Sequence, residues 1–496
     1  MSTASPVPSA RSGWTAVIGL EIHAQLRTAS KMFSRAPVSF GAPPNSQVNE
    51  VCAGLPGTLP TVNRRAVELG VLAGIALGCE VHTWSQFARK NYFYPDLPKG
   101  YQISQFEHPL CEHGRLSFDV DGRSVTCGIT RLHLEEDSGK SQHGGEEGWS
   151  RIDLNRAGTA LVEIVSEPDL RTAAEAAAYF KELRAILMAL GVNDGNLAEG
   201  SMRCDANISV RRGEDAPLGT KVEIKNLNSF KFLREGIDHE IERQIALIEG
   251  GGEVRQETRT WSESRRETVL LRSKEGSADY RYFPEPDLPP LIVTQEEIER
   301  LRGSLPELPA RKRERLQEEH GLSAYDADVL VSGDGLLELF DEAVKIHDNP
   351  KGLCNLLAGA VSAALNEGSL RSEAGQFVTG TGHAITPGAL AELQALVDDG
   401  RLSTTMARDV WERMLSDGRE PERIVSEDGL EQVSDTGALS ALVQGVLEAN
   451  PEKVAAYRAG KTGLMGFFVG QVMRSSGGKA DPRAVNEILS RALQPD

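Results

Sequence analysis

The chain has 496 residues, which is too long for a single hydrophobic core and predicts two to four domains. Its 40% hydrophobic and 25% charged residues are ordinary for a globular protein, and no apolar run approaches the roughly 20 residues that a membrane span needs. The net charge of -18 argues against a protein that coats nucleic acid non-specifically, although a local basic surface remains compatible with it.

The N-terminal residues and the spacing of the cysteines bear on where the protein is expected to be found. Residues 1–14 lack the apolar core of a signal peptide, and we interpret them as a flexible tail. The six cysteines are scattered without a short-spaced pair, at positions 52, 79, 111, 127, 204 and 354. This spacing argues against a disulfide framework and against a zinc ribbon, so we expect reduced thiols and a cytoplasmic location.

The first regular element is a strand within WTAVIGLEIHAQL, residues 14–26. Glu21 and His23 lie two residues apart and therefore project from one face of that strand, where both can ligate a divalent metal. Taken alone, Glu-x-His is a weak signal, and two exposed strand residues are its ordinary explanation. Turn residues follow, before a helix predicted from Arg64 to Leu77.

The next two segments are strand-like and rich in chemically active side chains. Residues 87–107 combine three basic with six aromatic side chains, which suits either base stacking or a core-facing hairpin with basic edges. In residues 128–140, alternation places Leu132, Leu134 and Glu136 on one face and His133, Glu135 and Asp137 on the other. Consecutive acids at the end of a strand, such as residues 135–137, are usually exposed to solvent and have no further role.

Residues 153–211 predict a strand, a helix and a second strand. Glu163 shares its strand face with apolar neighbours, so its carboxylate has to be paired, hydrogen-bonded or bound to a metal. Thr172 and Glu175 fit a capping box, and Gly191 fits the C-terminal cap. One face of the second strand packs, and the other presents Arg203, Asp205, Asn207 and Ser209. For a single strand, a half-exposed antiparallel strand is the ordinary explanation of that alternation.

Another strand follows at KVEIK, with Lys221, Glu223 and Lys225 on one face, and then a helix to about Ile248. The proline-punctuated segment 280–287 suits a lid or a domain border. From about Thr294 the pattern is helical, and Thr386-Pro387 supplies a cap and a first-turn proline for one of these helices.

The C-terminal region predicts a small helical bundle. Three glycines at helix-like spacing beside Phe467 and Phe468 suit close helix packing: Gly463, Gly466 and Gly470. Residues 451–496 carry seven Lys or Arg against four acids, a net charge of 7 - 4 = +3. From charge alone, an RNA contact and a solvated helical surface are equally good explanations.

Eight motifs, taken in order, resemble the GatB family, the tRNA-amidating subunits of the aspartyl/glutamyl-tRNA amidotransferase: VIGLEIHAQL, GLPGTLPTVN, RKNYFYPDLPKGYQISQ, GITRLHLEEDSGK, VEIVSEPD, GSMRCDANIS, KVEIKNLNSF and DYRYFPEPDLPPL. The resemblance extends from about Thr15 to the C-terminus. It implies an α+β fold with an antiparallel-sheet cradle of the glutamine-synthetase type over residues 15–293. An all-α helical domain over 294–406 and an all-α, tRNA-binding tail domain over 407–496 would follow.

The resemblance also implies an activity and partners within a heterotrimer. In that family a glutaminase (amidase) partner releases ammonia into a channel, a second, small partner straps the complex, and the GatB chain works as a carbon–nitrogen ligase. Using ATP and Mg²⁺ or another divalent ion, it phosphorylates and amidates Asp or Glu misattached to tRNA(Asn) or tRNA(Gln). No membrane is involved. The alternative is a non-catalytic tRNA-binding scaffold that retains the cradle.

Site residues follow from the same resemblance. The implied metal ligands are Glu21, His23, Glu136 and Glu163, with Glu136 chosen over Glu135 by alignment of HLEED with the family. Catalytic roles are expected for Glu136, Arg203, Asp205 and Glu223, and nucleotide contacts for Arg203, Lys221 and Lys225. Lys90 matches a position at the end of the ammonia channel, with an edge ion pair as its alternative. Some relatives have paired cysteines before the GLPG turn; only Cys52 is present here, so we expect no structural zinc.

Overall fold

The computed structural model describes residues 13–143, 148–273, 280–373, 375–430, 436–476 and 480–494. The chain divides into two compact units, residues 1–310 and 311–496. All but the last two residues of the predicted tail, 1–14, lie outside the described residues. The domain boundaries given above stay predictions, and the two units are described separately.

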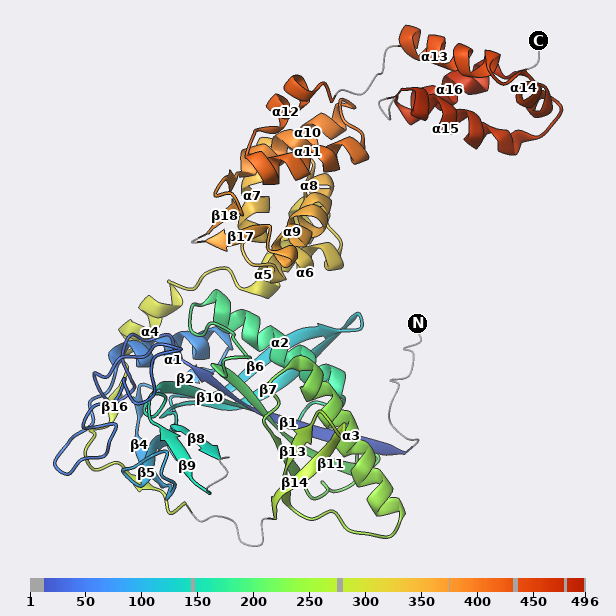
Figure 1. Ribbon diagram of the computed structural model, residues 1–496. Helices are drawn as coiled ribbons and strands as arrows, with labels where there is room; N and C mark the ends of the chain where they lie inside the picture. Colours follow the sequence, from blue (N-terminus) through green and yellow to red (C-terminus); the bar gives the residue numbers. More distant parts are fainter. Residues whose placement is uncertain are drawn as a thin grey trace. The chain divides into compact units, whose positions relative to one another are not determined.

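A nine-stranded sheet in the order β14-β13-β12-β11-β1-β10-β7-β6-β2 forms the first unit (Figure 1). Its strands are β1 (Trp14–Gln25), β2 (Glu80–Val81), β6 (Cys111–Val120), β7 (Arg123–Glu136), β10 (Ala160–Ser166), β11 (Met202–Arg212), β12 (Val222–Lys225), β13 (Glu257–Ser262) and β14 (Glu267–Ser273). Neighbouring strands run antiparallel, as predicted, except that β12 and β13 are parallel.

One face of this sheet is apolar and is covered by helices, namely α1 (Arg64–Ala76), α2 (Ala173–Ala189) and α3 (Phe230–Glu249) (Figure 1). Leu20, Ile22 and Ile164 are at most 1% exposed there. The predicted cap of α2 forms, because the Glu175 N–H donates to Thr172 Oγ1 at 3.1 Å. The Glu175 carboxylate accepts from Arg171 N–H rather than from the capping residue.

Three small sheets and a helix complete this unit. β4 (Phe87–Asn91) pairs with β5 (Tyr101–Gln105) and β15 (Phe283–Pro284). The other pairs are β3 (Trp84–Ser85) with β16 (Leu291–Ile292), and β8 (Lys140–His143) with β9 (Ser150–Asp153). The basic, aromatic segment is thus a hairpin whose base is buried at Phe87 and whose tip exposes Phe93. Helix α4 (Gln295–Arg302) adds Ile298 and Leu301 to the first core.

The second unit has two cores, the first of which contains buried residues from Leu316 to Val425. Its elements are α5 (Pro309–His320), α6 (Ala324–Ser332), α7 (Leu336–Ile346), α8 (Pro350–Leu356), the π-helical turn Leu357–Val361, α9 (Ser362–Glu367), β17 (Leu370–Glu373), β18 (Gln376–Thr379), β19 (Ala384–Ile385), α10 (Pro387–Asp398), α11 (Thr404–Asp417) and α12 (Pro421–Asp428). Thr386 caps α10 as predicted. The sheet β17-β18-β19 was not predicted, and position 406/407 falls inside α11.

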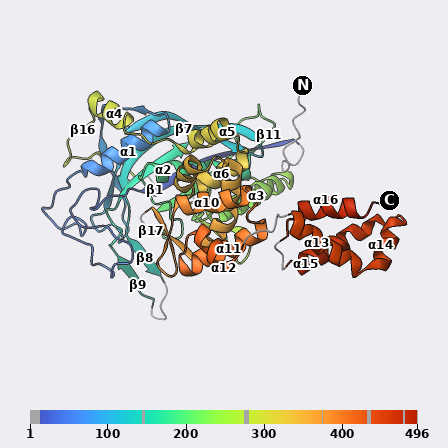
Figure 2. The same cartoon turned by 90° about the horizontal axis from the view of Figure 1, so that it is seen from above.

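The second core contains buried residues from Leu439 to Leu493 and is formed by α13 (Thr436–Glu448), α14 (Pro451–Arg458), the 3-10 turn Thr462–Leu464, α15 (Met465–Ser475) and α16 (Pro482–Ala492) (Figure 2). Phe468 is fully buried in it. The proposed role of Gly463, Gly466 and Gly470 in close packing is wrong, because a Cβ at any of them would face open space. The bundle is held by its apolar side chains instead.

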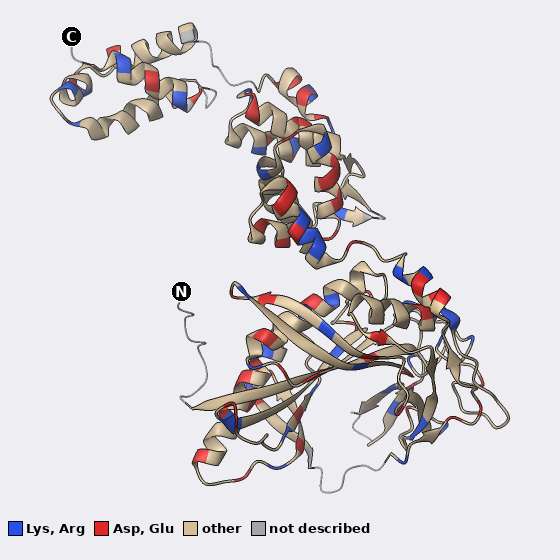
Figure 3. Cartoon of the chain, turned by 180° about the vertical axis from the view of Figure 1, so that it is seen from behind, with Lys and Arg blue, Asp and Glu red and all other residues tan. Residues whose placement is uncertain are grey.

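Acidic and basic side chains are interspersed along the helices of the second unit rather than separated (Figure 3). No helix among the described residues is both long and apolar enough to cross a membrane. A mixed sheet followed by a mainly helical half confirms the predicted α+β class.

Candidate active site

The uncovered face of the sheet carries polar side chains across five adjacent strands. Strand register brings them together: His23 on β1 lies opposite Glu163 on β10 and opposite Arg203 on β11. Glu163 in turn lies opposite His133 on β7. Directly opposed residues of antiparallel strands point to the same face, so these four side chains form one continuous polar row.

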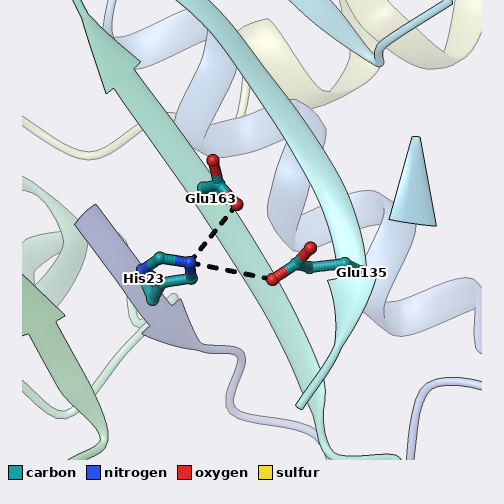
Figure 4. Close-up of side chains that lie close together, drawn as sticks. All are labelled: His23, Glu135 and Glu163. Atoms are coloured by element: carbon teal, nitrogen blue, oxygen red, sulfur yellow. Dashed lines mark ion pairs between the residues drawn. The ribbon is translucent and has the colours of Figure 1, made fainter. Parts of the chain in front are cut away.

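Three side chains at the centre of this face converge: His23, Glu135 and Glu163 (Figure 4). His23 Nε2 lies 3.3 Å from Glu163 Oε2 and 3.9 Å from Glu135 Oε1. One ligand atom from each residue lies within 4.8 Å of the others. An imidazole and two carboxylates at this spacing fit a divalent cation, for which nitrogen and oxygen donors are ordinary ligands.

Further polar groups orient these three. His133 Nε2 lies 3.7 Å from Glu135 Oε2 and 3.6 Å from Glu163 Oε2. Ser104 Oγ donates to Glu135 Oε2 at 3.1 Å. Each carboxylate therefore has partners that fix its direction, as outer partners do in metal sites.

The charges of this cluster shift one another's protonation. Burial lowers the pKa of His23, but the charge and hydrogen bond of Glu163 and the charge of Glu135 outweigh it and raise the pKa to about 9. Burial raises the pKa of Glu163, yet His133, His23 and Lys90 hold it well below its usual range. The same competition lowers the pKa of Glu135, mainly through the hydrogen bond from His133.

Lys90, on β4, is a cation beside this cluster. Burial lowers its pKa, but Glu135, Tyr282 and Glu163 raise it above its usual value. Its Nζ lies 4.9 Å from the ring centroid of Tyr280. The charge of Lys90 thus acts on Glu135 and Glu163, and its role stays a prediction.

Glu136 lies apart from the three converging side chains. Its carboxylate forms an ion pair with Lys99 and accepts a hydrogen bond from Ile103 N–H at 2.9 Å. Consecutive strand residues point to opposite faces, so Glu135 and not Glu136 projects toward His23. In the sequence, alternation placed Glu135 on the same strand face as His133. Glu136 was nevertheless expected as the ligand, because alignment with the family favoured it.

A second polar group lies farther along β1, β11 and β12. Glu21 Oε1 accepts from Asn207 Nδ2 at 2.8 Å, and burial followed by the charges of Glu163 and Glu223 raises its pKa. Lys225 Nζ lies 2.6 Å from Asp205 Oδ2 and 2.8 Å from Glu223 Oε1. Glu21 therefore lies near the central three residues but is not one of them.

The remaining expected residues lie at the edges of the polar face. Arg203 Nη2 lies 2.9 Å from both carboxylate oxygens of Asp137. Burial raises the pKa of Asp137, while Arg203 and Arg156 lower it below its usual range. Lys221 is exposed and directly precedes β12. Asp137 and His133 were not among the residues expected from the sequence, although alternation had placed both on the face of Glu135.

The cysteines are buried free thiols. Cys52 Sγ lies 3.4 Å from Lys31 Nζ and 3.4 Å from Ser34 Oγ. The expected lack of a structural zinc stays a prediction.

A sheet face that collects imidazoles, carboxylates and cations with shifted pKa values is typical of an enzyme active site. Comparison with known proteins specifies which kind. The model of the GatB/GatE catalytic domain matches residues 16–299, and that of the GatB domain matches residues 338–493. The chain belongs to the GatB family of amidotransferase subunits.

Full-length relatives agree with both matches. A protein from Anaeromyxobacter sp. (strain K) is 52% identical over 490 residues, which cover 97% of this chain and 99% of the relative. One from Syntrophotalea carbinolica is 50% identical over 485 residues, with the same coverage. Both are named as the B subunit of an aspartyl/glutamyl-tRNA(Asn/Gln) amidotransferase.

Proposed function

We propose that this chain amidates misacylated tRNA. It converts Asp-tRNA(Asn), Glu-tRNA(Gln) or both into Asn-tRNA(Asn) and Gln-tRNA(Gln), in an ATP-dependent carbon–nitrogen ligation in the cytoplasm. The observation that carries the proposal is the cluster of His23, Glu135 and Glu163 on the polar face. The printed names of the full-length relatives support the substrate class.

The reaction explains why a charged, buried face is needed. A carboxylate is a poor acylating agent, because none of its oxygens can leave readily. Phosphorylation of the side-chain carboxylate by ATP converts one oxygen into a leaving group, and ammonia then displaces phosphate to give the amide. Such a transfer depends on positioning and on neutralising charge more than on a covalent nucleophile.

His23, Glu135 and Glu163 are our choice for the residues that hold a divalent ion, with His133 and Ser104 orienting the carboxylates. A bound Mg²⁺ would supply positive charge that offsets the negative charge of a transferring phosphoryl group. Glu136, implied as a ligand by the family resemblance, instead neutralises Lys99.

The second polar group is our choice for the nucleotide side of the site. Lys225 is held between Asp205 and Glu223, and Thr258 Oγ1 donates to Glu223 Oε2 at 2.9 Å. These contacts hold the Lys225 ammonium group in one position without any contact from a substrate. Lys221, on the same strand face by alternation, extends this positive charge toward solvent.

Lys90 completes the site from the facing hairpin. A partly buried cation whose charge acts on Glu135 and Glu163 attracts the acceptor carboxylate and adds positive charge as phosphate departs. Its place on β4 also suits the end of an ammonia route from another protein. The partners that this role requires are a glutaminase subunit, which releases the ammonia, and the small strap subunit of the heterotrimer.

The tail contributes substrate affinity. Its core is separate from the other core of the second unit, and several basic residues remain on its surface. Lys453 lies against Phe467, with Nζ 3.3 Å from the ring centroid. We assign residues 451–496 a contact with the tRNA phosphates.

The test is amide formation on misacylated tRNA by the purified chain with ATP, Mg²⁺ and ammonia, with and without the glutaminase and strap subunits. Amide formed from ammonia by this chain, and from glutamine only when the glutaminase is added, supports the proposal. Tight tRNA binding without product under every combination would replace it with the alternative of a non-catalytic tRNA-binding scaffold.

A further inference from the structure

A cavity of about 630 Å³ opens where the polar face ends, beside the last residue of β1. Its lining includes Gln25, Arg27, Phe40, Lys140, Asp153 and Arg156. None of these residues belongs to the cluster of His23, Glu135 and Glu163. The cavity therefore lies outside the cluster, and its own side chains decide what it can bind.

The cavity lies next to the cluster. Gln25 follows His23 by two residues, so it points to the same face about 7 Å farther along the strand. Its Nε2 donates to Asp137 Oδ2 at 3.0 Å, and Asp137 also receives Arg203. Gln25 thus lines the cavity and also belongs to the polar network that continues through Asp137 to Arg203, the residue opposite His23.

Hydrogen bonds hold the charged side chains in the wall of the cavity in place. Arg156 donates from Nε to Ser138 O at 2.8 Å and from Nη2 to Gly139 O at 2.7 Å. These bonds hold its guanidinium beside Asp137, 3.6 Å away. Asp153 is fixed as an acceptor of the Asn45 and Asn155 N–H groups.

Three exposed side chains line the rim of the cavity and are available to bind a ligand: Arg27, Phe40 and Lys140. Phe40 lines the cavity and is 75% exposed, an unusual position for a phenylalanine that serves only the fold. Arg27 and Lys140 are exposed, and neither side chain has a hydrogen bond or an ion pair within the described part of the chain. An aromatic face between free cations suits a base with its phosphodiester.

The geometry points to this cavity as the subsite for the 3′-terminal adenosine of the aminoacyl-tRNA, with its base on Phe40 and its phosphodiester at Arg27 and Lys140. This inference rests on the proposed function. Acidic acceptors remain for the ribose hydroxyl that carries no amino acid, because Asp153 and Glu199 also line the cavity.

Length and charge favour the tRNA end over free ATP. From the esterified ribose oxygen to the side-chain carboxylate of Asp or Glu there are five or six bonds, about 6–7 Å when extended. That span matches the separation between Gln25 and His23 along β1. The cavity balances three cations with the acids Asp153, Asp194 and Glu199, which suits one phosphodiester better than a triphosphate.

The test uses the assembled amidotransferase and a tRNA that ends in 8-azidoadenosine. We expect photocrosslinking to residues 38–47, and loss of that crosslink when tRNA with an ordinary 3′ end is added in excess. Labelling of the same residues by 8-azido-ATP instead, or crosslinking of the tRNA end to another part of the chain, would overturn the inference. Amide formation by the same preparation shows independently whether the proposed function holds.

A binding measurement on variants provides the second arm. The probe is 3′-aspartylamido-3′-deoxyadenosine, a stable mimic of the aminoacylated end. Phe40→Ala should weaken its binding at least about fivefold, as expected for loss of one stacking contact, and Phe40→Tyr should restore most of it. Tyr325→Ala, which removes an exposed aromatic of the second unit, is the matched control. Equal affinity in Phe40→Ala and the control contradicts the assignment.

Discussion

Glu135 and Glu136 are adjacent carboxylates with opposite surroundings, and their amide variants should fail in different ways. In Glu135→Gln the side-chain volume and the contact with Ser104 remain, but a negative ligand is lost from the cluster. Removing an outer partner of a metal ligand costs about 10–100-fold in metal affinity. We therefore expect a loss of at least this size for Mn²⁺, used as a spectroscopic substitute for Mg²⁺, and a matching loss of amidation.

Glu136→Gln should instead destabilise the fold. The side chains of Glu136 and Lys99 are 4% and 11% exposed, so breaking their pair leaves a buried cation, at about 3–5 kcal/mol. Glutamine still accepts from Ile103 N–H, which favours the lower end of that range. Unfolding entropy is about 2.1 cal/mol/K per residue, so for the unit of residues 1–310 a loss of about 3 kcal/mol lowers the melting temperature by roughly 4–5 °C.

The assays are Mn²⁺ titration by electron paramagnetic resonance, calorimetric unfolding and ammonia-dependent amidation, all on the same preparations. Glu338→Gln changes an exposed carboxylate, with a side chain 70% exposed, and serves as the control. If Glu136→Gln loses Mn²⁺ binding while Glu135→Gln keeps it, the strand-face argument fails, and the ligand implied by the family resemblance is the right one.

Three further outcomes are expected. Lys90→Met should lower both ammonia- and glutamine-dependent kcat by about tenfold or more, with Lys90→Arg largely restoring it; unchanged kcat in the Met variant would remove Lys90 from the site. Truncation before residue 451 should raise KM for tRNA and weaken its salt dependence, whereas equal tRNA affinity would show that the tail is not a contact. The hydrogen bonds from Lys351 and Ser323 hold the pKa of Asp326 below its usual range, so their stabilisation is complete above the unfolded pKa of about 3.9 and is lost as the pH falls through the folded value. Between pH 7 and pH 3 the melting temperature of Asp326→Asn should therefore fall less than that of the unaltered chain, and parallel falls would contradict this.

Alternation identified the polar side of each strand, but a single strand does not reveal its neighbours. Glu163 was recognised as a carboxylate that needed a partner, and His23 as a possible ligand. Their contact depends on the register between β1 and β10, which pairs His23 with Glu163. Register is set by the packing of whole strands and cannot be obtained from one strand's pattern. Glu135 was left outside the expected site for another reason, because alignment of HLEED with the family favoured Glu136.

Other differences have local causes. β17, β18 and β19 are short and lie among glycines, so no periodicity was long enough to predict them. The glycines of the tail have helical spacing, but no facing backbone approaches them. In contrast, the caps at Thr172 and Thr386 depend only on residues within one turn, and both formed as expected.

The central position of β1 has a consequence for the synthesis of this protein. β1 is the first strand to leave the ribosome, yet its partners β10 and β11 end at Ser166 and Arg212. At roughly 5–20 residues per second, β1 waits about 10–40 s before both of its edges are paired. Until β11 is complete, at least one edge of this strand and its apolar face lack their partners, which is a hazard for aggregation. The strand that carries His23 is thus the first to be made and one of the last to be fully paired.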